Sequence, residues 1–316
     1  MATQTVVSPS ELKITLFKKQ TLGRGAYGVV CRAKYGELPC AAKLLQAVFF
    51  EDSDPAAQTM VDKFREECQR MSVLKHPNII QYLESYVDPD TGLPTLLMEE
   101  MDESLTALLA RSAPGLPLKT HVSICTDVAL ALSYLHACGI IHRDLSSNNV
   151  LLVSADRRAK VTDFGMSKLA RSPGQTRQLT QCPGCMVYMP PEALQEVPRY
   201  SFKLDVFSFG VLIIQMLTRN FPSPGPPMKT VRVEAGSPQF PMGGVVHVAI
   251  PEVERRKADI DTIVGAHPLK ELALPCLRDE EGSRPNVQEL CKQLANLKLQ
   301  VLGDGSRSTQ VCHGDL

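Results

Sequence analysis

The feature that most constrains the fold of this chain is a change of hydrophobic period near residue 101. Residues 12–49 contain three short runs typical of β-strands, LKITLF, GVVCRAKYG and PCAAKLL, separated by glycine-bearing turns. Two further strand-like runs, IIQYLESYV and LPTLLMEE, flank a predicted turn at residues 89–92. Between the two groups, after Pro55, a helix is predicted from apolar residues at helical spacing: Val61, Phe64, Cys68, Met71 and Leu74.

The remainder of the chain has a helical period. One predicted helix is amphipathic, with Val122, Cys125, Ala129, Leu132 and His136 on one face. Residues 205–217 are apolar nearly all round, which favours a buried helix, although their β-branched side chains leave a strand open. A last helix is predicted after Pro285 from Val287, Leu290, Leu294, Leu297 and Val301. This order of elements predicts an α+β fold of two lobes, a strand-rich one followed by a larger helical one.

The charge balance excludes one large class of function. The chain has 34 Lys and Arg residues and 34 Asp and Glu residues, so its formal net charge is zero. A nucleic-acid binder needs many cations to neutralise phosphates, so no nucleic acid is expected as a partner. The start of the chain has no apolar signal region, and residues 211–217, the longest strongly apolar stretch, are too few to span a bilayer. We therefore expect a cytoplasmic protein without a transmembrane segment and with reduced cysteines.

A glycine-rich motif, GRGAYGVV, occupies residues 23–30. Gly23, Gly25 and Gly28 would let backbone amides approach a phosphate, because a Cβ atom would block that approach. A dinucleotide-binding site would need a helix after the motif, whereas the residues that follow it read as another strand. From the residues alone, a phosphate-binding loop and a plain glycine-rich hairpin both stay open.

Lys43 is a single cation in the otherwise apolar run PCAAKLL. Burying an ammonium group costs free energy unless a partner neutralises its charge. Glu67 falls on the apolar side of the first predicted helix, so an ion pair between Lys43 and Glu67 is one explanation for both residues. The other explanation is that both side chains extend into solvent.

Two later polar clusters carry groups suited to phosphate chemistry. The first, IHRDLSSNNVLL at residues 141–152, contains Asp144 and Asn149, and the second, TDFG at residues 162–165, contains Asp163. A carboxylate can accept a proton from a hydroxyl group, and Mg²⁺ prefers carboxylate and amide oxygens as ligands. Asp144 is therefore a candidate proton acceptor, and Asn149 and Asp163 are candidate Mg²⁺ ligands.

The order of these four motifs resembles that of a protein kinase domain. The resemblance extends to MPPE at residues 189–192, which is similar to the Ala-Pro-Glu motif of that family, and to DVFSFG at residues 205–210 and Arg284-Pro285. It covers roughly residues 16–298 and implies the two-lobed protein kinase fold. The implied domains are an N-terminal extension (1–15), an N-lobe (16–98), a hinge (99–101), a C-lobe (102–298) and a C-terminal tail (299–316).

The resemblance also implies a role for each motif. The glycine-rich loop would cover the phosphates of ATP, and Lys43 would hold two of them while paired with Glu67. Asp144 would orient the acceptor hydroxyl of a protein substrate and take its proton, while Asn149 and Asp163 would hold Mg²⁺. Glu192 and Arg284 are implied to form a structural ion pair. The residues implied at the adenine site are Leu22, Val30, Ala41, Met98, Glu99, Met101 and Leu151.

The sequence departs from the family pattern at several positions. Ser146 stands where serine/threonine kinases usually have Lys, and Cys185 where they have Thr. Pro190 and Phe207 replace Ala and Trp. This mixture is most similar to the tyrosine kinase-like group, whose members act mostly on Ser or Thr. The implied activity is transfer of the γ-phosphoryl group of MgATP to protein hydroxyls, Ser/Thr favoured. The alternatives are a tyrosine or dual-specificity kinase, a small-molecule kinase, and a pseudokinase that acts as a nucleotide-binding scaffold.

Residues 163–192 are implied to be the activation segment. Between its two ends the segment contains cations and no acidic residue, so it would repel Arg143, which precedes Asp144. A phosphate group would reverse this repulsion, so phosphorylation of Thr176 or Thr180, by an upstream kinase or by the chain itself, is expected to raise activity. A disulfide within Cys182-Pro183-Gly184-Cys185 is the competing means of control. A zinc site there is not expected, because no second pair of ligands stands at matching spacing.

Overall fold

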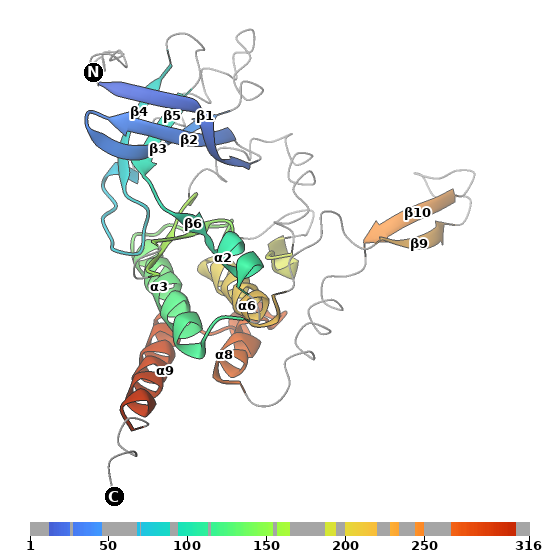
Figure 1. Cartoon of the computed structure of the whole chain (residues 1–316). Helices are drawn as coiled ribbons and strands as arrows, with labels where there is room; N and C mark the ends of the chain where they lie inside the picture. The colour runs from blue at the N-terminus through green and yellow to red at the C-terminus, as the bar shows by residue number, and fades with distance from the viewer. Residues whose placement is uncertain are drawn as a thin grey trace, which may run out of the picture.

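The computed structural model describes residues 13–25, 28–45, 68–69, 71–88, 94–112, 115–153, 157–164, 187–193, 200–219, 228–233, 244–249 and 267–307. Within these stretches a five-stranded sheet forms one lobe and helices form most of the other (Figure 1). The architecture is the predicted two-lobed α+β arrangement. In the described stretches, no helix combines the length and the apolar character that crossing a membrane requires.

The strands of the first lobe are antiparallel and follow the order β1-β2-β3-β5-β4. All the strand-like runs of the sequence are confirmed as strands. A tight turn with Gly36 at φ +60° joins β2 to β3, a conformation that glycine adopts without strain. The bounds are Ile14–Gly25 (β1), Gly28–Tyr35 (β2), Leu38–Leu45 (β3), Tyr82–Val87 (β4) and Pro94–Glu99 (β5).

The sheet buries apolar side chains on both faces, because successive residues of a strand point to opposite sides. On β3, Cys40 and Ala42 join a small cluster within the first lobe, whereas Ala41 between them joins the main core. On β5, Leu97 joins the small cluster and Met98 the main core. One face of the sheet therefore shares a core with the helical lobe, and this shared face carries the candidate site.

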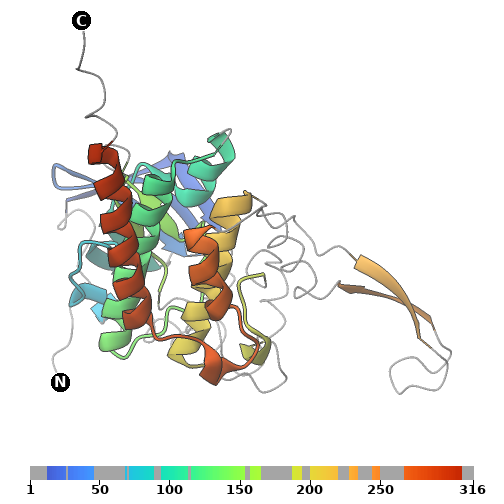
Figure 2. The ribbon, with the colours of Figure 1, turned by 90° about the horizontal axis from the view of Figure 1, so that it is seen from below.

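The helical lobe begins with a small three-stranded sheet of order β6-β7-β8. β8 is tied to the chain that enters β4, since Ile79 bridges Val161 and Ile80 N donates to Val161 O over 3.0 Å. The small strands are Glu103–Ser104 (β6), Val150–Leu152 (β7) and Ala159–Val161 (β8). The helices are Leu105–Arg111 (α2), Leu118–Ala137 (α3), Phe202–Thr218 (α6), Pro268–Cys276 (α8) and Val287–Arg307 (α9), with short 3-10 turns at Pro191–Ala193 (η3) and Glu281–Ser283 (η4). A hairpin of Met228–Val233 (β9) and Gly244–Ala249 (β10) stands apart in both views (Figures 1 and 2).

Three of the predicted helices are confirmed. α3 packs against α9 (Figure 2), and their predicted apolar faces are buried at, among others, Leu132 and Leu294. α6 is buried from Leu204 to Met216, and the hydroxyl of Ser201 caps it by accepting a hydrogen bond from Lys203 N over 3.1 Å. The cap and the all-round burial rule out the strand alternative for this segment. α9 continues to Arg307, into the residues that the sequence assigned to the tail.

The helix predicted after Pro55 lies mostly outside the described residues. Its last turn is described, and Cys68, Met71 and Leu74 are buried in the main core as predicted. Glu67 and the turn at residues 89–92 are not among the described residues.

The cysteines of the described stretches are free thiols, and most are buried. Burial raises the pKa of Cys40 to about 11 and that of Cys276 to about 12. Both are therefore protonated at neutral pH and serve as small apolar core residues. Cys182 and Cys185 lie outside the described residues.

Candidate active site

The glycine-rich motif closes the hairpin between β1 and β2. Gly23 pairs with Val30 and Gly25 pairs with Gly28, so the motif is followed by a strand, as predicted, and a dinucleotide-binding arrangement is excluded. A Cβ atom added to Gly23 would meet nothing within 4 Å. Packing within the described part of the protein therefore does not require glycine at this position, and the open space leaves room for a ligand close to the backbone.

Lys43 on β3 forms an ion pair with Asp163, which follows β8. The distance from Lys43 Nζ to Asp163 Oδ1 is 2.7 Å. Lys43 is 4% exposed, whereas the Asp163 side chain keeps 25% of its surface exposed. The pair joins the two lobes at the shared face of the sheet. The predicted pair between Lys43 and Glu67 stays a prediction, because Glu67 is outside the described residues.

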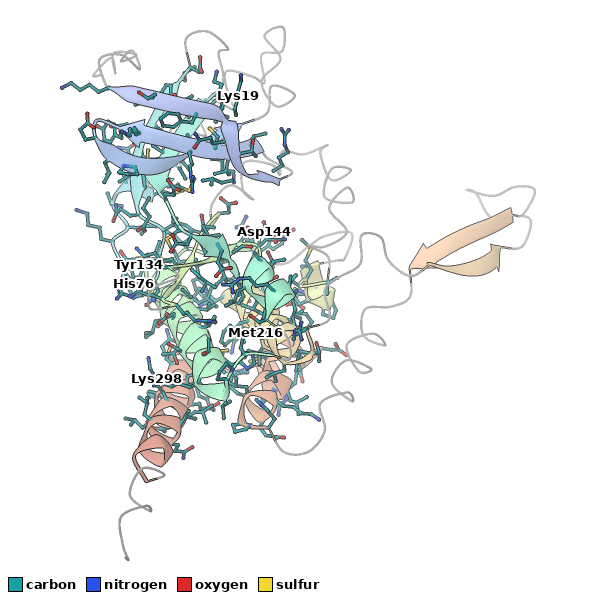
Figure 3. The ribbon with its side chains drawn as sticks, viewed as in Figure 1. Lys19, His76, Tyr134, Asp144, Met216 and Lys298 are labelled. Carbon is teal, nitrogen blue, oxygen red and sulfur yellow. The ribbon has the colours of Figure 1, made fainter. Side chains whose placement is uncertain are left out.

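Asp144 and Asn149 are in direct contact. Asn149 Nδ2 donates to the backbone oxygen of Asp144 over 2.7 Å and to its carboxylate Oδ2 over 3.0 Å. Figure 3 shows Asp144 at the end of the helical lobe that faces the five-stranded sheet. Because the amide nitrogen of Asn149 is used on Asp144, its Oδ1 atom is the part left to accept a ligand.

The backbone of Thr162 connects these two pairs of residues. Thr162 N donates to Asn149 O over 3.0 Å, and Thr162 O lies 2.9 Å from His142 Nε2. His142 Nδ1 accepts a hydrogen bond from Asp144 N over 3.2 Å, so the proton of this ring is on Nε2, which donates to Thr162 O. No side-chain motif reveals this role of Thr162, because it comes from backbone atoms.

Asp205 on α6 fixes the backbone that leads into Asp144. It is fully buried and accepts hydrogen bonds from His142 N (2.8 Å) and Arg143 N (2.9 Å), and its Oδ2 lies 2.8 Å from His136 Nε2. Arg143 has φ +69° and Asp163 has φ +63°, a region that costs a non-glycine residue of order 1–3 kcal/mol. Buried hydrogen bonds of this kind are what keep such backbone strain in place.

Two aromatic contacts flank this backbone. Phe164 is buried in the main core, with its ring edge-on to His142 at a centroid distance of 6.3 Å. The guanidinium of Arg143 lies over the ring of Tyr200, 5.1 Å from its centroid. Thr176 and Thr180, expected as phosphorylation sites near Arg143, are outside the described residues.

The residues implied at the adenine site come from both lobes. Ala41 and Met98 are buried and directly opposite each other on β3 and β5. Three more are partly buried against the same core: Val30, Met101 and Leu151. Leu22 on β1 is 43% exposed.

The side chain of Glu99 has protein partners. Its carboxylate oxygens lie 2.6 and 2.8 Å from Lys160 Nζ, and Oε1 also accepts from Gln81 N over 2.6 Å. Lys160 is on β8, three residues before Asp163. This contact links the end of β5 to the strand that leads into Asp163, a link that the sequence did not predict.

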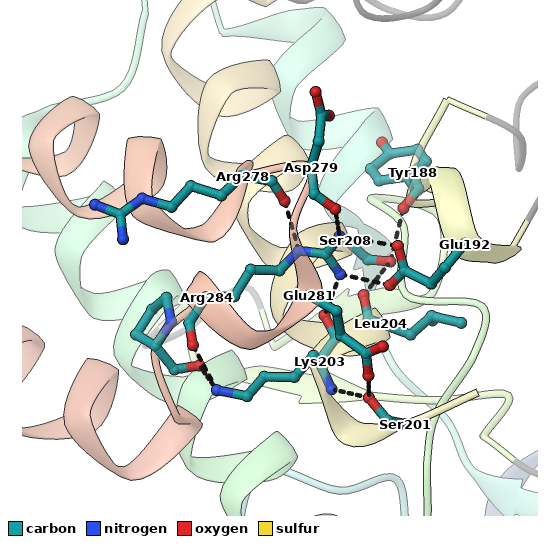
Figure 4. A network of polar contacts seen from close by, with 11 residues as sticks. Tyr188, Glu192, Ser201, Lys203, Leu204, Ser208, Arg278, Asp279, Glu281 and Arg284 are labelled. Atoms are coloured by element: carbon teal, nitrogen blue, oxygen red, sulfur yellow. Dashed lines mark hydrogen bonds and ion pairs between the residues drawn. The ribbon is translucent and has the colours of Figure 1, made fainter. Parts of the chain in front are cut away.

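The ion pair predicted between Glu192 and Arg284 is confirmed (Figure 4). Arg284 Nη1 and Nη2 donate to the two carboxylate oxygens over 2.6 and 2.9 Å. The guanidinium also donates to the backbone oxygens of Arg278 (2.7 Å) and Asp279 (3.0 Å) and lies 4.9 Å from the ring centroid of Phe207. Phe207 thus supplies the aromatic face where the family usually has Trp.

The residues brought together fit a magnesium nucleotide. Among the described residues, Asn149 Oδ1 and Asp163 Oδ2 have no hydrogen-bond partner, and both are oxygen donors of the type that Mg²⁺ prefers. Lys43 on β3 places a cation beside Asp163. Gly23, where the space beside the backbone is open, lies on β1, and β2 separates β1 from β3 in the sheet.

Comparison with known proteins also indicates a protein kinase domain. The family model for the protein kinase domain matches residues 16–294. The serine/threonine/tyrosine-protein kinase HT1 of Arabidopsis thaliana is 32% identical over 66% of this chain and 52% of its own length. The calmodulin-binding receptor-like cytoplasmic kinase 2 of the same plant is 29% identical over 86% of this chain and 66% of its own length. The serine/threonine-protein kinase TNNI3K of Mus musculus is 30% identical over 64% of this chain and 24% of its own length.

The chain thus spans between about a quarter and two thirds of the length of these relatives. The relatives include serine/threonine kinases and one named for all three hydroxyl residues, which agrees with the motif mixture of the tyrosine kinase-like group. With a family match over most of the sequence and two lobes in the expected order, this chain belongs to the protein kinase domain family.

Proposed function

We propose that this chain is an active protein kinase that transfers the γ-phosphoryl group of MgATP to hydroxyl groups of a protein substrate, with Ser and Thr favoured over Tyr. The family membership supports the class of reaction. The proposal that the chain itself is active rests on the side chains present at its site.

One observation carries the proposal: the residues needed for the reaction form a single connected arrangement. Lys43 contacts Asp163, Asp163 follows Thr162, Thr162 is bonded to Asn149, and Asn149 contacts Asp144. These residues come from three separate parts of the sequence. A fold that had lost its activity would have no need to keep these two pairs of functional side chains connected.

Each residue has a defined task in this proposal. Bound MgATP supplies the group to be transferred and the divalent charge that offsets its oxygens. Asn149 Oδ1 and Asp163 hold the metal ion, and the Lys43 ammonium neutralises phosphate charge. Asp144 orients the acceptor hydroxyl and takes its proton as that oxygen bonds to the γ-phosphorus, while the bond from this phosphorus to the bridging oxygen breaks and ADP leaves. Because the transition state of phosphoryl transfer is loose, catalysis here consists mainly of positioning and charge stabilisation.

The residues around the nucleotide follow from the same proposal. Gly23, Gly25 and Gly28 cover the phosphates. Leu22, Val30, Ala41, Met98, Met101 and Leu151 enclose the adenine ring. The Glu99 carboxylate is used by Lys160 and Gln81, so Glu99 contributes to adenine binding through its backbone. Glu67 pairs with Lys43, as the resemblance to protein kinases implies.

The organisation and control of the chain are part of the proposal. The N-lobe comprises residues 16–98, the hinge 99–101 and the C-lobe 102–298, between an extension (1–15) and a tail (299–316). The protein acts in the cytoplasm. Phosphorylation of Thr176 or Thr180, by the chain itself or by an upstream kinase, raises activity by placing a phosphate near Arg143.

A single experiment separates the proposal from a pseudokinase. The purified chain is incubated with radiolabelled ATP, Mg²⁺ and dephosphorylated casein, and the labelled protein is then hydrolysed to identify its phosphoamino acids. We expect phosphoserine or phosphothreonine to dominate, and labelling to stop when Asp144 is changed to Asn. Phosphotyrosine as the main product would indicate the tyrosine or dual-specificity alternative. No transfer, together with measurable binding of MgATP, would indicate the pseudokinase.

A further inference from the structure

Behind the candidate active site, four side chains from four parts of the sequence form a buried row of polar contacts. Thr106 Oγ1 on α2 lies 2.7 Å from Ser147 Oγ, and Ser147 Oγ lies 3.2 Å from the hydroxyl of Tyr188. The Tyr188 hydroxyl donates to Gln215 Oε1 on α6. Ser147, Tyr188 and Gln215 are at most 5% exposed.

The chemistry of the groups gives this row a direction. A hydroxyl group has one proton, and Tyr188 uses its proton on Gln215, so it can only accept from Ser147. Ser147 therefore donates to Tyr188 and accepts from Thr106. Ser147 N also approaches the Tyr188 oxygen, at 3.4 Å. Removing the Tyr188 hydroxyl would leave three buried polar atoms with a lost partner, which is costly in an interior.

The row passes through the loop that carries the proposed catalytic groups. Ser147 stands between Asp144 and Asn149, and the backbone of the same residue is held as well, since Thr106 N donates to Ser147 O over 3.1 Å. Tyr188 is fixed from the other side, because Ser208 Oγ on α6 donates to Tyr188 O over 2.8 Å (Figure 4). The loop is thus anchored to α2 and α6 through one serine.

We infer that Ser147 and Tyr188 are positioning residues for phosphoryl transfer, which hold Asp144 and Asn149 in place without contacting the nucleotide or the substrate. The inference rests on the proposed function for its effect on the rate. Tyr188 is also within residues 163–192, the segment implied to be the activation segment, so the same contact ties the later part of that segment to the loop of Asp144 and Asn149. Misplacement of a catalytic group by about 1 Å can cost roughly 10²-fold in rate.

The test compares variants that remove one hydroxyl group at a time. With dephosphorylated casein as acceptor, Tyr188→Phe and Ser147→Ala should each lower kcat about tenfold to a hundredfold, while the KM for ATP changes less than about twofold. The double variant should be no slower than the worse single variant, because both break the same row. Thr106→Val should lower kcat, and Thr106→Ser, which keeps the hydroxyl, should restore it.

The matched control is Thr126→Val. Thr126 is also a buried hydroxyl, but it donates within α3 to Val122 O over 2.7 Å and is not a member of the row. The kcat of the Thr126→Val protein should equal that of the wild type. Wild-type kcat in folded Tyr188→Phe and Ser147→Ala proteins would overturn the inference, as would effects that simply add in the double variant.

A second measurement keeps the inference separate from the proposed function. Amide hydrogen exchange of residues 142–150 needs no catalysis, and it should be faster in Tyr188→Phe than in the wild type or Thr126→Val. If the wild type transfers no phosphate, the proposed function fails while this readout still decides the inference. Unchanged exchange in Tyr188→Phe would refute the anchoring of the loop.

Discussion

Lys43 on β3 and Asp163, 120 residues later, form an ion pair in which Nζ lies 2.7 Å from Oδ1. The lysine is buried in the sheet, whereas the aspartate stands on a backbone of positive φ at the edge of the helical lobe. The lysine is therefore positioned by regular strand pairing, and the aspartate by the strained segment that Thr162 connects to His142 and Asn149. The two side chains therefore meet where the strand β3 of one lobe approaches the strained segment after β8 of the other lobe.

This relationship predicts coupling between the two residues. Lys43→Met should abolish phosphoryl transfer and lower the free energy of unfolding, because it leaves the Asp163 carboxylate without its cation. The loss should be below the roughly 3–5 kcal/mol of a fully buried pair, because the Asp163 side chain is 25% exposed. Urea unfolding of Lys43→Met, Asp163→Asn and the double variant should give a coupling energy of about 1–3 kcal/mol. Losses that add independently would mean that the pair does not contribute to stability.

Asp144→Asn should separate catalysis from binding. The amide oxygen of the new side chain can still accept from Asn149 Nδ2, so the loop should keep its shape, but it can no longer take a proton. We expect kcat to fall at least about 10²-fold to 10⁴-fold, with little change in the affinity for MgATP measured by calorimetry. Asp163→Asn should instead weaken Mg²⁺-dependent nucleotide binding. Turnover near the wild-type rate in Asp144→Asn would refute the proposed role.

Lys160→Met should affect ATP binding more than turnover. Its Nζ holds both carboxylate oxygens of Glu99 at the end of β5, where the adenine ring is proposed to bind. If Glu99 is no longer held in place, a loss of about 1 kcal/mol in the binding free energy of ATP would raise the KM for ATP several-fold, with kcat nearly unchanged. Lys34→Met is the matched control, because Lys34 contacts only the exposed Glu37 at 3.9 Å in the described structure. An unchanged KM for ATP in Lys160→Met would show that the Glu99 carboxylate needs no fixing.

Glu192→Gln should destabilise the helical lobe. It leaves the buried guanidinium of Arg284 without a counter-charge, although three backbone oxygens still accept from it. We expect a loss of about 3 kcal/mol, the low end for one partner of a buried pair, measured by urea unfolding. Glu103→Gln, in the exposed pair with Arg111, should lose far less. Equal losses in the two variants would contradict this account.

The stability of the protein should fall in acid partly through His121. Burial, with a smaller contribution from the nearby His267, lowers the pKa of His121 from 6.5 to about 4. Between these values the unfolded chain binds a proton that the folded chain does not, so stability is complete above pH 6.5 and is lost as the pH falls toward 4. The loss should be on the order of 3 kcal/mol. His121→Leu should flatten the curve of unfolding free energy against pH, and parallel curves for the two proteins would rule His121 out.

The longer helices and strands could be predicted because the spacing of apolar residues that reveals them is a local property of the sequence. Strand-like runs between glycine-bearing turns indicated the strands of the sheet, and apolar patterns at helical spacing indicated α3, α6 and α9, including Val122, Cys125 and Leu290 as core residues. His136 was placed on the apolar face of α3, where it is instead a polar contact of the buried Asp205. The strands β6, β7 and β8 were missed, because runs of two or three residues are too short to show a period.

The functional side chains could be predicted as types, but their contacts could not. The motifs identified Lys43, Asp144, Asn149 and Asp163, because their chemistry is unusual for their surroundings. Neither the pair of Lys43 with Asp163 nor that of Lys160 with Glu99 follows from spacing, since each depends on how two lobes meet. The role of Thr162 could not be predicted for another reason, namely that it acts through its backbone.

The packing of α3 against α9 has a consequence for how the protein is made. α3 ends at Ala137, whereas α9 begins only at Val287, so the ribosome must synthesise almost the entire domain before the partner of α3 exists. Until then the part of α3 that packs against α9 has no cover, although β8 and α6 can already contact α3. Contacts between such distant parts of a chain form slowly. We therefore expect the nascent chain to depend on chaperones late in translation, and a stop codon before Leu290 to yield an aggregation-prone product even though every proposed catalytic residue has been made.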